Sequence, residues 1–63
     1  MPKPQELFDI DGEIVAETEK AWLIFDGTKK EWLPKSQCEI EEKQDGTVVV
    51  TMPTWLAKAK GFL

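Results

Sequence analysis

Hydrophobic and polar residues alternate along the first third of the chain. The even-numbered positions from 8 to 16 carry Phe8, Ile10, Gly12, Ile14 and Ala16, whereas most of the intervening residues are acidic. Alternation with a period of two is typical of a strand that turns one face to a core and the other to water. The pattern predicts a strand over residues 8–16, in which Gly12 marks a bulge or bend that lets the strand curl.

A hairpin is predicted next, after a short polar turn. The run Ala21–Phe25 has apolar residues on both faces, as expected for a strand that is covered on both sides. The Asp26-Gly27 pair that follows favours a tight hairpin into a strand over Lys30–Pro34. Pro34 closes this strand because proline cannot donate a ladder hydrogen bond, and residues 35–37 then form a corner.

Two more strands complete the predicted sheet. In the segment 37–43 we expect Cys38 and Ile40 to point inward and Glu39, Glu41 and Lys43 to point outward. Asp45-Gly46 is a second hairpin signal. The segment 47–52 that follows is rich in β-branched residues, and its inward face is expected to carry Val48, Val50 and Met52.

The hydrophobic period changes after the last strand. Pro53 and Thr54 supply an early-helix proline and a candidate N-cap, and Gly61 supplies a helix terminator. We therefore predict a helix over residues 54–60 that either caps a barrel opening or covers the second apolar face of residues 21–25. Its inward side is expected to carry Trp55, Leu56, Ala59 and either Phe62 or Leu63.

These elements predict a mainly β fold, a five-stranded antiparallel SH3-like small barrel with a short C-terminal helix. An OB-type barrel is similar in size but more usually places its helix between strands. We expect residues 1–5 to form a loose lead-in. Residues 6–63 are expected to form a single small barrel domain that includes the terminal helix 54–60, because a chain of 63 residues fits one domain.

The charge of the chain is acidic. Eight lysines stand against twelve acidic residues, with no arginine and no histidine, which gives a formal net charge of −4. Affinity for nucleic acid comes largely from cations that meet phosphates, and arginine is the usual reader of guanine. This balance disfavours an autonomous nucleic-acid binder, although a local lysine patch is still compatible with it.

The residue inventory also argues against catalysis. The chain has no histidine, one serine and one cysteine, so no nucleophile has a usual general base beside it. Asp9, Asp11 and Glu13 are spaced too widely along a strand to cage one cation, and Cys38 follows the inward pattern of a buried thiol. We expect a protein that is not an enzyme and uses no metal or cofactor. Without an apolar signal core or a membrane-spanning run, we expect it to be cytoplasmic.

Two tryptophans are the first candidate binding residues. Trp22 and Trp32 alternate out of register with Leu23, Phe25 and Leu33, so we expect both on the face opposite the main core. If the terminal helix covers that face, the two rings form a second small core. If it does not, they form an exposed aromatic platform.

Lysines lie close to these tryptophans in the sequence. Aromatic faces beside cations hold single-stranded nucleic acid by stacking and charge, and small barrels often do so. The simpler interpretation is that lysines at a hairpin tip keep a β edge soluble. The cations concerned are Lys29, Lys30 and Lys35.

An acidic stripe is the alternative candidate surface. Such a stripe is usually a solvated strand face, but it could also imitate a nucleic-acid backbone and occupy a basic site on another protein. No lysine interrupts it before Lys20. Its members are Asp9, Asp11, Glu13, Glu17 and Glu19.

The segments ETEKAWLIF, EWLPKSQCEI and MPTWLAKAKGF resemble small uncharacterised proteins encoded by bacteriophages and prophages. In that group a tryptophan-X-proline-lysine-serine corner precedes a short terminal helix, and the resemblance covers Glu17–Phe62. It implies a compact accessory factor, either one that works near DNA replication and recombination or an inhibitor of a host defence complex. No catalytic residue comes with it.

Our leading prediction is a non-enzymatic binding module that acts through a protein partner. A single-stranded nucleic-acid-binding small barrel is the first alternative, and an acidic, nucleic-acid-mimicking inhibitor is the second. Self-association into a homo-oligomer is compatible with each of these predictions. The solvent exposure of Trp22 and Trp32 is the property that separates them most directly.

Overall fold

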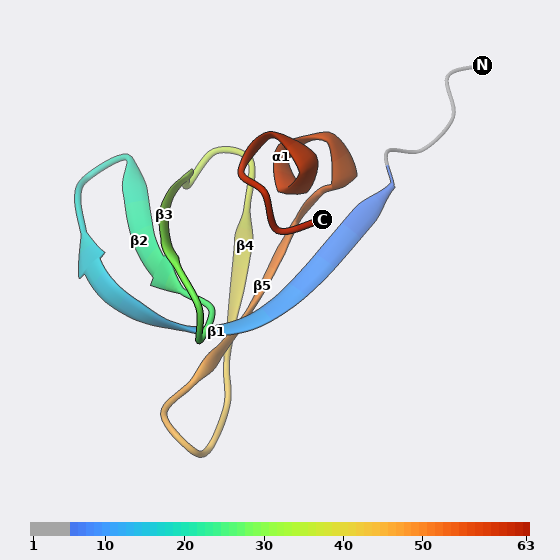
Figure 1. The fold of residues 1–63 in the computed structure, drawn as a ribbon. Coiled ribbons are helices and arrows are strands. Elements are labelled where there is room, and N and C mark those ends of the chain that lie inside the picture. Colours follow the sequence, from blue (N-terminus) through green and yellow to red (C-terminus); the bar gives the residue numbers. More distant parts are fainter. Residues whose placement is uncertain (1–5) are drawn as a thin grey trace.

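The computed structural model describes residues 6–63, which form one antiparallel five-stranded sheet followed by a short helix (Figure 1). This confirms the predicted strand number, the antiparallel pairing and the terminal helix. The prediction of a loose lead-in at residues 1–5 lies outside the described residues. The elements are β1 (Leu7–Glu17), β2 (Ala21–Phe25), β3 (Lys30–Pro34), β4 (Glu39–Glu42), β5 (Val48–Pro53) and α1 (Thr54–Ala59).

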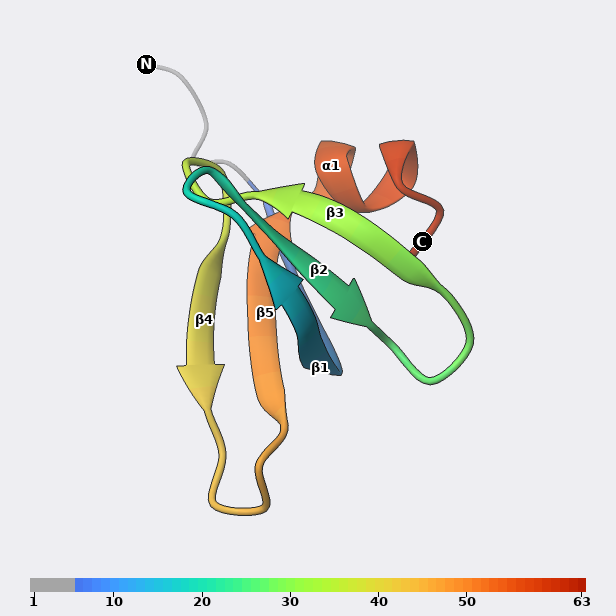
Figure 2. The same ribbon diagram turned by 90° about the vertical axis from the view of Figure 1, so that its left-hand side faces the viewer.

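The long strand β1 organises the sheet, whose strand order is β3-β2-β1-β5-β4. Its first half pairs with β5, from Leu7 opposite Pro53 to Gly12 opposite Val48. Its second half pairs with β2, starting at Glu13 opposite Phe25. Because β1 serves two partners in turn, the sheet bends along it, and β2 and β3 run across the direction of β4 and β5 (Figure 2).

Gly12 lies where β1 changes partner. A side chain there would place its Cβ 2.7 Å from the backbone oxygen of Phe25 and 3.0 Å from the Ile24 side chain. The bulge itself lies further along, where the register shifts between Ile14 and Ala16. Of the two predicted alternatives at Gly12, the bulge is therefore misplaced, whereas the bend is found, because β1 changes partner there. The glycine also permits the close approach of β2.

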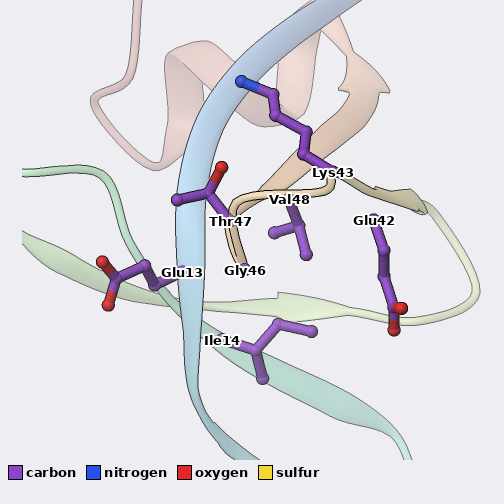
Figure 3. Close-up of a pocket in the computed structure, with 7 residues that line it drawn as sticks. All are labelled: Glu13, Ile14, Glu42, Lys43, Gly46, Thr47 and Val48. Carbon is purple, nitrogen blue, oxygen red and sulfur yellow. The ribbon is translucent and has the colours of Figure 1, made fainter.

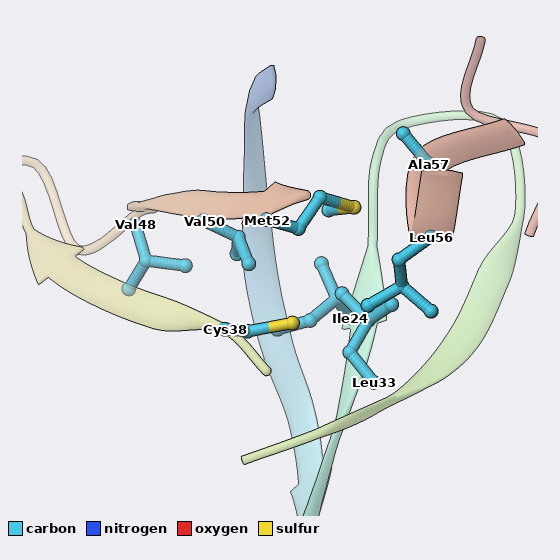
Figure 4. Packing of buried hydrophobic residues seen from close by; sticks show 8 residues of the cluster. All are labelled: Ile24, Leu33, Cys38, Val48, Val50, Met52, Leu56 and Ala57. Carbon is cyan, nitrogen blue, oxygen red and sulfur yellow. The ribbon is translucent and has the colours of Figure 1, made fainter. Parts of the chain in front are cut away.

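The core lies inside this bend (Figure 4). The predicted inward face of β5 is confirmed, since its alternate residues are buried. That of β1 is confirmed as far as Ile14, which stands opposite the buried Ile24, whereas Ala16 lies beyond the bulge, opposite Leu23 on the outer face. The predicted inward direction of Cys38 and Ile40 is also confirmed. The buried residues are Ile24, Leu33, Cys38, Val48, Val50, Met52, Leu56 and Ala57.

The two faces of β2 are the reverse of the prediction. Ile24 is fully buried and Trp22 packs against the core, whereas Leu23 and Phe25 lie on the outer face and are half-buried. The run AWLIF contains no polar residue that marks its outer side, so its own pattern does not choose between the faces. The pairing with β3 makes the choice, because it sets Trp22 opposite the buried Leu33.

The helix packs through Leu56 and Ala57, which are buried against the sheet. Trp55 is 52% exposed and Ala59 is also exposed, so the predicted docking through these two residues is wrong. The helix has only six residues and follows β5 directly. The geometry of that junction therefore sets which side of the helix faces the sheet. Pro53, not Thr54, occupies the N-cap position.

The helix ends as its glycine predicts. Gly61 has a φ of 80°, and the N–H of Phe62 donates to the carbonyl of Ala57 at 2.8 Å. This is a Schellman motif, which satisfies carbonyls that the helix leaves free. The side chain of Lys29 donates to the carbonyl of Lys60, and its Nζ lies 4.8 Å from the centre of the Phe62 ring. The hairpin between β2 and β3 therefore holds the end of the chain in place.

The sheet does not close into a complete barrel. Among residues 6–63, β3 pairs with β2 only and β4 pairs with β5 only. The corner at residues 35–37 joins these two edge strands. Pro34 ends β3 at that corner, where the N–H of Gln37 donates to its carbonyl at 3.1 Å.

Candidate functional site

The predicted two-tryptophan platform is not formed, because the rings lie on opposite faces of the sheet. Trp22 stands opposite Leu33 on the core face, and Trp32 stands opposite Leu23 on the outer face. Residues directly opposite in an antiparallel pair share a face, so the register separates the two rings. The prediction that both rings lie opposite the core is wrong for Trp22 and right for Trp32, which is 43% exposed.

The three candidate lysines are separated as well. Lys29 is held against the end of the chain. Lys35 forms an ion pair with Glu17 and places its Nζ 5.4 Å from the centre of the Trp22 ring. Lys30 stands opposite Phe25 on the outer face, the same face as Trp32. Of the five predicted binding residues, the fold therefore brings only Lys30 and Trp32 onto one open surface.

That surface is largely apolar, and we call it the outer β2–β3 face. Trp32 lies on the edge strand of this face, beside Leu23 on the central strand. Beyond the bulge, β1 contributes Ala16, which stands opposite Leu23. All its apolar members are half-buried or exposed: Ala16, Ala21, Leu23, Phe25, Trp32 and Pro34.

Two opposite charges flank one end of the outer β2–β3 face. Glu13 stands opposite Phe25 from β1, and Lys30 stands opposite Phe25 from β3. Both charged residues are exposed. At the other end, beyond Pro34, a hollow of about 440 Å³ is lined by the turn residues Glu19 and Lys20 and by the corner. The face is thus an apolar surface with charged groups at its margins.

Sequence reasoning missed Leu23 and Phe25 as surface residues. A signal was present, however, in the turn between β2 and β3. A four-residue turn over Asp26–Lys29 sets Phe25 opposite Lys30 and, further along the ladder, Trp22 opposite Leu33. Once Leu33 is assigned to the core, this register also assigns Trp22 to the core and Leu23 to the outer face.

The predicted acidic stripe is split by the bulge. Asp9, Asp11 and Glu13 share the outer face of β1, because they alternate with the core-facing residues. Glu17 lies beyond the bulge, opposite Trp22, and pairs with Lys35. Glu19 lies in the exposed turn that follows β1. The stripe is therefore shorter along β1 than the sequence predicts.

The acidic surface is also wider than predicted. Glu39 and Glu41 of β4 stand opposite Thr51 and Val49 of β5, which in turn stand opposite Asp9 and Asp11. These acidic residues were recognised in the sequence only as a solvated set, since strand pairing was needed to bring them beside β1. Within the surface, Asp9 accepts from the Thr51 hydroxyl at 2.7 Å and Asp11 forms a 2.7 Å ion pair with Lys43. Mimicry of a nucleic acid by this surface stays a prediction.

A hollow of about 340 Å³ separates β1 from the hairpin between β4 and β5 (Figure 3). Ile14 and Val48 lie in its middle, and the carboxylates of Glu13 and Glu42 point to opposite sides. Lys43 points away, and its hydrogen bond to Asp11 raises its pKa. The polar groups of this hollow do not converge on one point, so it provides no common reaction centre.

Cys38 is the one cysteine of the chain and is buried. Desolvation raises the pKa of its thiol, because burial disfavours the charged thiolate. The thiolate is the reactive form, so this environment favours a packing role over a nucleophilic one. Among residues 6–63, the acidic residues and the cysteine form no group that could hold a metal ion.

Comparisons with protein-family models, with curated proteins and with solved structures give no match to this chain. The resemblance to phage-encoded proteins therefore stays a prediction. In the described part of the chain, the one helix is too short to cross a membrane.

Proposed function

We propose that this protein is a non-enzymatic binding module that contacts a protein partner through the outer β2–β3 face. The observation that carries the proposal is the position of Trp32, which is 43% exposed within an apolar sheet face. A chain of 63 residues has little apolar surface to spare for water, because its core is small. Apolar side chains gathered on an outer face are therefore best explained by a partner that covers them.

The composition of the face supports this proposal. Protein interfaces combine an apolar centre with a polar rim, and tryptophan is enriched among the residues that contribute most to binding. Here Leu23 and Trp32 lie in the middle, and Glu13 and Lys30 lie at one margin. Hydrogen-bonded strands carry the apolar side chains, which limits the conformational entropy lost on binding.

Single-stranded nucleic acid is a less favoured ligand for the same face. Of the five residues predicted for stacking and charge, Lys30 and Trp32 alone share it, and the net charge of −4 opposes a phosphate backbone. The antiparallel strands bend around one core, which supports the predicted small-barrel class. The barrel would be an open one, because its edge strands β3 and β4 do not pair in the described residues. We retain the SH3-like and phage-accessory descriptions as proposals.

The test places a photoreactive amino acid at position 32 of the full chain, and in a matched variant at position 55. Both tryptophans are exposed, but Trp55 lies on the helix, away from the outer β2–β3 face. Irradiation in the native host is expected to give protein adducts from position 32 and not from position 55. Circular dichroism establishes that both variants are folded.

Two results contradict the proposal. One is the absence of any adduct specific to position 32. The other is an adduct that nuclease treatment removes, which assigns the face to nucleic acid instead. An adduct specific to position 32 that resists nuclease supports the proposal, whether its mass corresponds to a second copy of the chain or to another protein.

A further inference from the structure

We infer that the occupant of the outer β2–β3 face is a second copy of this chain, packed face to face in a two-fold dimer whose axis runs parallel to β2. The inference rests on the proposed function and names its partner. It follows from the order of charged, small and large residues in the rows that run across the three strands. This order is self-complementary under one rotation, which is the requirement for a symmetric dimer interface.

The ladder arranges the face in rows that cross from β1 through β2 to β3. The first row is Glu13, Phe25 and Lys30. The second row is Ala16, Leu23 and Trp32. Within each row the outer two residues lie two strand spacings apart, about 10 Å.

A two-fold axis along β2, midway between two stacked sheets, exchanges the outer strands and keeps each row at its own level. It places β3 of the second copy over β1 of the first, and the reverse. In the first row Lys30 of each copy then faces Glu13 of the other. Two opposite-charge pairs form at the margin of the interface, and no like charges of this row meet.

The second row is complementary in shape under the same rotation. Trp32 of each copy lies over Ala16 of the other, so that the largest side chain of the face meets one of the smallest. Leu23 meets its own symmetry mate on the axis. Aligned sheets pack about 10 Å apart with interdigitating side chains, and alternation of large and small residues allows this spacing.

The other face-to-face orientation lacks this match. A two-fold axis perpendicular to the strands keeps each strand over its own mate and inverts the rows. Lys30 then lies over the apolar end of β3 near Pro34, and Glu13 lies over the end of β1. That end carries Glu19 and Lys20 as adjacent turn residues, so neither charge is set against a group of opposite sign alone. The axis along β2 pairs each charge directly with an opposite charge and is therefore favoured.

The experiment is sedimentation equilibrium of the full chain from about 1 μM to about 1 mM, the range over which a weak to moderate dimer dissociates. We expect a mass that rises from the 7.2 kDa of one chain to twice that value. Trp32→Ala should raise the dimer dissociation constant at least about thirtyfold, the effect of a central interface residue. Trp55→Ala, which removes an exposed tryptophan elsewhere, should leave the constant unchanged.

Charge reversal tests the orientation. Glu13→Lys and Lys30→Glu should each raise the dissociation constant at least about tenfold, because each sets two like-charge pairs across the interface. A mixture of these two variants, or the double variant in one chain, should dimerise again. Restored dimerisation cannot arise from a simple loss of stability, so it identifies the pairing itself.

A chain that stays monomeric up to about 1 mM overturns the dimer. So does a dimer that Trp32→Ala leaves intact, or one whose two charge reversals fail to restore each other. These outcomes are distinct from failure of the proposed function. A monomer that still gives adducts specific to position 32 with another protein retains the binding module and excludes self-association as its role.

Discussion

Single residues decide which surfaces this small domain offers. Trp22 and Trp32 have the same chemistry and similar surroundings in the sequence, yet one packs against the core and the other is 43% exposed. The lysines near them differ in the same way, since Lys29 holds the end of the chain and Lys30 lies on the open face. Residue type alone therefore does not identify the site. The site is identified by the face of the sheet on which each residue lies.

Gly12 is expected to be intolerant of any side chain. The Cβ of an alanine would lie 2.7 Å from the Phe25 backbone oxygen, and neither β1 nor β2 can retreat without breaking the ladder. We predict that Gly12→Ala lowers the free energy of unfolding by about 1–3 kcal/mol, as overpacking does. Urea unfolding measures the change, with Val15→Ala at the exposed bulge as control. Equal stability of Gly12→Ala and the natural chain would show that β2 does not approach so closely.

At the scale of elements, the two tight turns set the register of both hairpins. The side chain of Asp26 accepts from the N–H groups of Thr28 and Lys29 at 2.8 and 2.9 Å, and Gly27 adopts a φ of 100°. Asp45 accepts from the N–H and the hydroxyl of Thr47 at 3.0 and 2.6 Å. These bonds fix the turns, and the turns fix which residues face each other along the strands.

The same bonds predict a dependence of stability on pH. Hydrogen bonds from Lys29 and Thr28 lower the pKa of Asp26, and hydrogen bonds from Thr47 lower the pKa of Asp45. A carboxylate with a lowered folded-state pKa stabilises the folded chain above its unfolded-state pKa of 3.8. That contribution is lost as the pH falls through the lowered value.

We therefore expect the free energy of unfolding to fall on acidification below about pH 4, and to fall less in the double variant Asp26→Asn/Asp45→Asn. Denaturant unfolding at a series of pH values measures both slopes. Glu19→Gln is the control, because it removes a charge from the exposed turn before β2. Identical slopes for the double variant and the natural chain would contradict this role of the turns.

At the scale of the whole molecule, one core joins the two halves of the bent sheet. Leu56 from the helix packs with Ile24 and Leu33 from one half and with Met52 from the other (Figure 4). The helix thus closes one end of the bend in a sheet whose edges do not pair with each other in the described residues. Its neighbour Trp55 points to solvent and contributes little to this packing.

Adjacent helix residues should therefore differ sharply in their effect on stability. Leu56→Ala removes a side chain that is 4% exposed, and we expect it to lower the free energy of unfolding by about 2–4 kcal/mol. Trp55→Ala should change it by less than about 1 kcal/mol, since that ring is largely in water. Thermal and urea unfolding of the two variants provide the comparison. A larger loss for Trp55→Ala than for Leu56→Ala would restore the docking role that the helical pattern predicts for the tryptophan.

Much of the fold was predictable because its signals are local. Period-two alternation identified β1, the Asp-Gly turns located both hairpins, and the bounds of β2 and β3 agree with the structure. The inward face of β5 and that of β1 as far as Ile14 also followed from the alternation, whereas Ala16 beyond the bulge did not. The candidate site was only half predicted: Trp32 and Lys30 were named, whereas Leu23 and Phe25 were assigned to the core.

The sequence by itself determined the number and order of the elements, the two turns and the acidic face of β1, because each depends on neighbours along the chain. Tertiary structure alone decided which side of β2 is buried, where the bulge lies, and which side of the helix meets the sheet. A strand that is apolar on both sides carries no local marker of its buried face. Its face is fixed by the register with β3 and by the bend of β1 at Gly12, and this arrangement leaves Trp32 on the outside.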